Sequence, residues 1–360
     1  MKLTLIFLFL FALSINGNAQ KYSKPQRTVV YGQVYNTNFG KIKTVKISIS
    51  QFGLPVKQFS SKLDAQGNFK LSFLIYTQAD CWLSYYNSFM FLIHPGDSLQ
   101  VKFNSFMDNI YFWNEIQFSG DAADTNSEIR DFQYLYFSNV DYYNPLGRER
   151  AMKEYDLVQY KLYLDSIRVK NKKLYDRFLM RKKFNEETKA WALYFLEEDY
   201  YNALSFYPDQ HRKANNLTKK EWDVPLTYYD ELKKRLPITE SMFICSDALS
   251  QYIANYHYNY VKKKVWAEEA NQKYITEKGN IAPRHVMDSL AVYGILKHTQ
   301  DNLLRQMELL DLFSREFQSL QVEHFETYRA VFDTYVKEPY LREPFLELYA
   351  QTKEKIKQKH

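Results

Sequence analysis

Glycine is concentrated near the N-terminal end of this chain. Seven of the ten glycines stand within the first 120 of the 360 residues, namely Gly17, Gly32, Gly40, Gly53, Gly67, Gly96 and Gly120. Because glycine supplies the tight turns between strands, this distribution predicts β structure up to residue 120 and helices beyond it. No two glycines are close enough together to form a phosphate-binding loop, which argues against P-loop and Rossmann folds.

The segment 20–120 has the pattern of short β-strands. Apolar and polar residues alternate over residues 45–50, which is the period of a half-buried strand. Gly67 and Gly96 stand in turn sequences between apolar segments, where glycine accepts a positive φ. Six to eight strands separated by such turns predict an antiparallel β-sandwich.

After residue 120, apolar residues recur at the three- and four-residue steps of helices. Thr125 or Asn126 can cap the first helix, and Asn185 can cap another. Further helices are expected over 148–183, 241–261, 264–278, 283–299, 301–320, 324–336 and 340–357, with Pro208, Pro225 and Pro237 marking connections. The predicted fold class is therefore α+β, with an N-terminal antiparallel β-sandwich over 20–120 followed by an all-α helical domain over 121–360.

The first 19 residues have the layout of a secretory signal peptide. Lys2 precedes an apolar run over residues 3–13, and Gly17 and Ala19 occupy the −3 and −1 positions of a cleavage site. The run is about half of the roughly 20 residues that span a bilayer, although an uncleaved anchor is the alternative. We therefore expect a periplasmic or secreted protein with no transmembrane segment after cleavage. Because no cysteine follows the run, we expect no lipid anchor.

Cysteine and histidine usage argues against redox and metal chemistry. Cys81 and Cys245 are the only cysteines, and the chain has no C-x-x-C dithiol motif. We expect two buried thiols, and a disulfide between them stays open as the alternative. The seven histidines are dispersed, and no pair has the i, i+4 spacing of a helical zinc site. We therefore expect no cofactor and no metal.

The charge distribution argues against a nucleic-acid partner. The net charge of +6 is carried mainly by the β segment, whereas residues 121–360 have equal numbers of basic and acidic side chains. An exported chain with a neutral helical domain is unlike a nucleic-acid binder. The carboxylates of Glu197, Glu198 and Asp199 are interpreted as a solvated helix face. Since no nucleophile or acid–base constellation stands out, we expect that the protein is not an enzyme.

The aromatic residues of the β segment suggest one binding site. Exposed rings stack on sugars, and we take as candidates for glycan binding Tyr85, Tyr86, Tyr111 and Trp113. The favoured interpretation of the aromatic side chains in this segment is that they fill the core of the sandwich. His94, at a strand end, is interpreted as a turn residue rather than a catalyst.

Four stretches of the chain carry a resemblance to a known family. Residues 63–69 are similar to a D-x-x-G-x-F hairpin, residues 92–101 to a P-G-D turn, and residues 116–126 to an entry into helices. Together with residues 337–346 they resemble the N-terminal β-domain and helical region of envelope TlpA-like, thioredoxin-family thiol-disulfide oxidoreductases. The resemblance implies this accessory architecture without redox activity, because no position matches the family's catalytic C-x-x-C and its C-terminal thioredoxin domain is lacking.

These observations lead to one main functional hypothesis and two alternatives. The main hypothesis is an exported, non-catalytic envelope protein that acts as a binding or interaction module for an unknown envelope protein or ligand. The first alternative is an accessory part of a thiol-disulfide system whose thioredoxin domain is supplied by another chain. The weaker alternative is a glycan-binding protein that uses the four aromatic residues named above.

Overall fold

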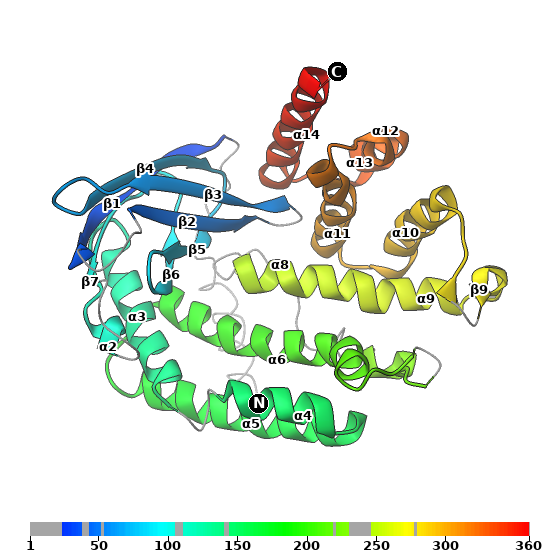
Figure 1. Ribbon diagram of the computed structural model, residues 1–360, viewed down its shortest axis with the longest axis horizontal. Coiled ribbons are helices and arrows are strands. Elements are labelled where there is room, and N and C mark those ends of the chain that lie inside the picture. The colour runs from blue at the N-terminus through cyan, green and yellow to red at the C-terminus, as the bar shows by residue number, and fades with distance from the viewer. Residues whose placement is uncertain are drawn as a thin grey trace, which may run out of the picture.

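The computed structural model has an N-terminal β region followed by helices, which confirms the predicted α+β class (Figure 1). It describes residues 24–37, 43–51, 54–104, 111–139, 144–218, 221–229, 246–276 and 279–359. The expected signal peptide lies outside the described residues. No helix among the described residues is both long enough and apolar enough to cross a membrane.

Within the described residues, eight strands form two four-stranded sheets. The strands are β1 (Gln26–Tyr35), β2 (Thr44–Gln51), β3 (Leu54–Lys62), β4 (Asn68–Ile75), β5 (Ala79–Ser84), β6 (Ser88–Ile93), β7 (Ser98–Asn104) and β8 (Gln117–Gly120). The sheet orders are β4-β1-β7-β8 and β3-β2-β5-β6. All neighbouring strands are antiparallel except β1 and β7, which are parallel.

Glycine permits the parallel pair. A Cβ atom on Gly32 of β1 would lie 1.7 Å from the backbone oxygen of Val101 in β7, so no other residue fits at this close approach. The two predicted turns are also found, because Gly67 and Gly96 have positive φ values of 80° and 95°.

The helical region contains helices of very different lengths, from the four residues of α2 to the 29 residues of α6. Its elements near the sandwich are α2 (Tyr111–Asn114), α3 (Ala123–Phe137), α4 (Pro145–Glu154), α5 (Leu157–Leu179), α6 (Glu186–Ala214) and α8 (Ser246–Asn255). Farther along the chain lie η3 (Tyr256–Val261), α9 (Lys262–Ala267), η4 (Glu269–Tyr274), β9 (Ile275–Thr276), β10 (Gly279–Asn280), α10 (Arg284–His298), α11 (Asn302–Ser314), η5 (Arg315–Ser319), α12 (Glu323–Thr327), α13 (Arg329–Tyr335) and α14 (Pro339–Lys359). Helices α5, α6 and α8 run side by side (Figure 1).

Several details of the helices differ from the sequence-based expectations. The helix expected over 264–278 is not continuous, because α9 ends at Ala267 and is followed by η4 and by the short strand β9, which pairs with β10. The region after residue 120 is therefore mainly, but not entirely, helical. The helix expected over 148–183 is broken, because Asp156 starts α5 with a capping box that includes Gln159. Pro208, expected in a connection, lies inside α6. A proline at this position cannot donate to the carbonyl of Leu204, and the hydroxyl of Tyr228 donates to that oxygen instead, at 2.7 Å. Pro237 lies outside the described residues.

Strand β6 joins the sandwich to the helices. One of its faces packs in the sandwich core, whereas Met90 and Leu92 on the other face pack against α3, α5 and α6. As the last strand of its sheet, β6 has a free edge, and α3 covers that edge with amide side chains. Asn126 bonds the backbone N–H and C=O of Leu92 at 2.6 and 2.9 Å, and Gln133 does the same for Met90 at 3.3 and 2.9 Å. These bonds pair the backbone groups of the edge, which would otherwise be open to pairing with a strand of another molecule and so to aggregation.

Candidate functional site

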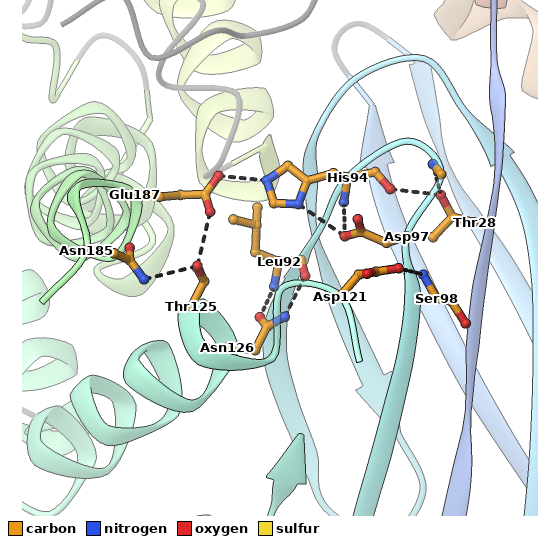
Figure 2. A network of polar contacts seen from close by, with 11 residues as sticks. Thr28, Leu92, His94, Asp97, Ser98, Asp121, Thr125, Asn126, Asn185 and Glu187 are labelled. Atoms are coloured by element: carbon orange, nitrogen blue, oxygen red, sulfur yellow. Dashed lines mark hydrogen bonds and ion pairs between the residues drawn. The ribbon is translucent and has the colours of Figure 1, made fainter. Parts of the chain in front are cut away.

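A polar network at the end of β6 holds the sandwich onto the start of α6 (Figure 2). His94 contacts the Asp97 carboxylate through Nδ1 at 3.1 Å and the Glu187 carboxylate through Nε2 at 2.7 Å. The hydroxyl of Thr125 donates to the second Glu187 oxygen at 3.3 Å, and Asn185 both caps α6 and donates to Thr125. We call the set of His94, Asp97, Thr125, Asn185 and Glu187 the clamp.

The clamp is a structural contact. Burial would lower the pKa of His94, but hydrogen bonds and charges from Asp97 and Glu187 outweigh it and raise the pKa to about 10. The imidazole is therefore positively charged at neutral pH and has both ring nitrogens engaged. This arrangement fits the interpretation of His94 as a turn residue rather than a proton-transferring base.

A second polar contact holds the sandwich onto the start of α8. Asp80 of β5 is 2% exposed and accepts hydrogen bonds from the Ser246 hydroxyl at 2.5 Å and from the backbone N–H of Asp247 at 3.0 Å. The Asp247 carboxylate in turn accepts from the Ser50 hydroxyl at 2.5 Å and from the indole N–H of Trp82 at 3.3 Å. Strands β2 and β5 thus fix the first turn of α8.

A third carboxyl group lies close to this contact. Glu198 of α6 is fully buried, and neither of its oxygens has a hydrogen-bond partner within the described part of the chain. Burial raises the pKa of Glu198 well above its ordinary value, and the charges of Asp80 and Asp247 raise it further. Burial likewise raises the pKa of Asp80 to about 7, against the hydrogen bond from Ser246. Three carboxyl groups therefore lie close together, and none of them has a basic partner among the described residues.

Asp80 and Asp247 line a cavity of about 360 Å³ between the outer face of the second sheet and the helices. Its lining residues are Asp80, Trp82, Met90, Arg148, Met152, Tyr160, Phe195, Asp199, Asn202, Ala203, Phe206, Asp247 and Gln251. Arg148 is paired with Asp199 by two hydrogen bonds of 2.8 and 2.6 Å. Once this pair is set aside, the lining has an excess of carboxyl groups beside aromatic rings. The cavity is thus acidic and aromatic.

Tyr85, Tyr86 and Trp113 are not among the residues that line this cavity. Tyr85 is buried, and Trp113 is half-buried and stacks on Phe137 with ring centroids 5.5 Å apart. Tyr86 is 51% exposed. Tyr111 begins α2, and its side chain lies outside the described structure.

Cys81 of β5 is buried, as expected, and forms no disulfide within the described residues. Burial raises the pKa of its thiol well above the ordinary value, and the charge of Asp80 adds to this effect. The thiol therefore stays protonated and unreactive at neutral pH. Cys245 lies outside the described residues, so the expected pairing alternatives remain predictions.

Sequence reasoning missed the residues of the cavity, and two signals pointed to them. Glu198 was expected on a solvated face, but it is three and seven residues from the buried Tyr201 and Trp191, which places it on the core face of α6. Trp82 stands between Cys81 and Leu83, both of which face the sandwich core, so strand alternation places the indole on the outer face. The sequence of helix α8 contains no comparable pattern that would have indicated its place at the cavity.

The chain matches no protein-family model, no curated protein and no solved structure. The resemblance to TlpA-like oxidoreductases gains nothing from these comparisons and stays a prediction. The cavity is consequently interpreted from its own chemistry.

Proposed function

We propose that this chain is an exported, non-catalytic binding protein of the cell envelope, and that its cavity binds a small organic cation. The observation that carries the proposal is the combination of carboxyl groups and aromatic rings around one cavity. Export rests on the signal-peptide layout of the first 19 residues.

The lining favours a positively charged ligand with apolar substituents. The Trp82 indole donates to Asp247, so this ring and this carboxylate are held in a fixed relation at the cavity. A cation near the face of an aromatic ring is stabilised by about 1 kcal/mol or more when water is excluded. The excess negative charge adds a Coulomb attraction that a neutral molecule of the same shape lacks. A volume of about 360 Å³ is within the size range of small-molecule sites.

The hydrogen bonds of the carboxyl groups support binding rather than catalysis. Asp80 and Asp247 both accept hydrogen bonds that hold α8 against the sandwich. A group that performs acid–base chemistry needs an oxygen positioned on the substrate's proton. Here the carboxylates maintain the wall of the cavity and its negative charge.

The test is isothermal titration of the protein with choline and with 3,3-dimethylbutan-1-ol, its neutral isostere. We expect choline to bind at least about tenfold more tightly, because only the cation gains the Coulomb and cation–π terms. Asp247→Asn should weaken choline binding by a similar factor. Asp176→Asn, an exposed residue of α5 outside the cavity, is the matched control and should bind like the wild type. Equal affinity for the two probes, or no binding of choline, would contradict the proposal.

A further inference from the structure

Three potential metal ligands converge at the far side of the helical region from the clamp. Asp288 of α10, Glu316 of η5 and His324 of α12 each place a ligand atom within 4.8 Å of the other two. They come from three separate elements, so the cluster results from tertiary packing and not from the local spacing of one helix. Sequence inspection for i, i+4 histidine pairs could not have found it.

The histidine of this cluster is buried, and one of its ring nitrogens lacks a hydrogen-bond partner among the described residues. His324 is 6% exposed, and its Nε2 has no hydrogen-bond partner among the described residues. Its ring packs between the rings of Phe313 and Tyr328, with centroid distances of 5.4 and 5.2 Å. One carboxylate oxygen of Glu316 is likewise buried without a partner in the described structure. Buried polar atoms of this kind are rare and costly unless a further group satisfies them.

A cation already lies beside the two carboxylates. The Arg284 guanidinium bonds Glu316, and its Nε lies 3.9 Å from Asp288. The Arg284 side chain is 61% exposed, so it can turn into solvent without leaving a cavity. The arginine thus satisfies part of the charge of the cluster from outside, but it leaves the imidazole nitrogen without a partner.

We propose that Asp288, Glu316 and His324 form a binding site for one divalent transition-metal cation of the Zn²⁺ type. One imidazole and two carboxylates supply the nitrogen and oxygen donors that Zn²⁺ accepts, and three protein ligands leave a fourth position for water or another ligand. The same cation would satisfy the buried imidazole and both carboxylates. It would also join α10, η5 and α12, and Arg284 is its competitor for the carboxylates. This site is independent of the cavity.

The test is titration of the chelator-treated protein with ZnCl₂ by calorimetry, with MgCl₂ as the comparison. We expect the wild type to bind one equivalent of Zn²⁺ at this site and to bind Mg²⁺ at least about tenfold more weakly, because Mg²⁺ prefers an oxygen-only shell. Zn²⁺ should also raise the unfolding temperature of the wild type, because it binds the folded state.

Two variants test proposed ligands, a third is the matched control, and a fourth tests the competing arginine. Asp288→Asn and His324→Gln should each weaken Zn²⁺ binding at least about tenfold. His285→Gln changes an exposed histidine of the same helix and should leave binding unchanged. Arg284→Gln should tighten binding severalfold, because it removes the competing charge. Asp288 is at the surface of the cluster, so Asp288→Asn keeps the test valid if His324→Gln fails to fold.

Three results would overturn the proposal. They are the absence of Zn²⁺ binding by the wild type, wild-type affinity in a folded Asp288→Asn variant, and loss of binding in His285→Gln. Weaker binding by Arg284→Gln would also count against it, since the arginine would then support the site rather than compete for it.

Discussion

The clamp and the cavity wall both attach the sandwich to helices, but their charges are arranged in opposite ways. At the clamp, a positively charged His94 lies between two carboxylates, and both Glu187 oxygens have partners. At the cavity wall, burial and the charge of Asp247 raise the pKa of Asp80, and burial and the charges of Asp80 and Asp247 raise the pKa of Glu198, which lies close to them. The two contacts lie near the same open end of the β5–β6 hairpin, because Asp80 pairs with Leu92 and His94 directly follows β6.

This difference separates a contact that stabilises the fold from one that is poised for a ligand. Opposite charges with complete hydrogen bonding offset the cost of their desolvation, and removing one partner leaves the other charge buried and uncompensated. Like charges in a buried place cost free energy, and proteins tolerate them mainly at functional sites. A bound cation at the cavity would offset that cost, whereas the clamp offers no position for one. The predictions below test this contrast.

The largest effect is expected from Glu187→Gln. The substitution removes the charge that faces the His94 imidazolium, and it should lower the free energy of unfolding by about 2 kcal/mol. Urea denaturation measures the change. Glu186→Gln is the matched control, because its side chain is 89% exposed and should change stability by less than about 0.5 kcal/mol. Equal effects of the two substitutions would show that the clamp adds nothing to stability.

A smaller effect is expected at the cavity wall, and it should depend on the substituted side chain. Asp80→Ala removes the acceptor for Ser246 and for the backbone N–H of Asp247, and should cost about 1.5 kcal/mol at pH 7. Asp80→Asn keeps an acceptor oxygen and removes the charge, so its stability should equal or exceed that of the wild type. A large loss in Asp80→Asn would mean that the negative charge itself stabilises the contact.

The two contacts should change the free energy of unfolding over different pH ranges. The pKa of Asp80 is raised to about 7 from 3.8, so the wild type bears no ionisation cost below pH 4 and bears it in full above pH 7. Asp80→Asn should therefore gain stability relative to the wild type as the pH rises from 4 to 8. The pKa of His94 is raised to about 10 from 6.5, so the clamp contributes fully below pH 6.5 and loses its contribution as the pH rises through 10.

Urea denaturation at pH 4, 6, 8 and 10.5 measures both windows. The destabilisation by Glu187→Gln should be largest at pH 6 and smaller at pH 10.5, where His94 is neutral even in the wild type. The relative gain of Asp80→Asn should be complete by pH 8. A constant difference between either variant and the wild type over its window would contradict the assigned pKa shift.

The sequence could predict the division of the fold but not the surface where its parts meet. Gly67 and Gly96 mark turns between neighbouring strands. The helical periodicity after residue 120 can be recognised without knowing what each helix packs against. Pro208 could not be placed, because its tolerance depends on a hydroxyl donated by Tyr228 from another segment. The cavity depends on contacts such as Ser50 with Asp247, which are 197 residues apart. Local pattern carries no information about such pairs.

The smallest effect is expected from Glu198→Gln, the same chemical change as at the clamp. Burial raises the pKa of Glu198 well above its ordinary value, which favours the neutral side chain in the folded wild type. The amide has the same shape and charge, and we expect the free energy of unfolding to change by less than about 0.5 kcal/mol at pH 5. At pH 8 ionisation of this side chain lowers the free energy of the unfolded wild type, and the variant has no such ionisation. Glu198→Gln should therefore become the more stable protein. Destabilisation at pH 8 as large as that of Glu187→Gln would mean that Glu198 is ionised and paired, and the contrast between clamp and cavity wall would then fail.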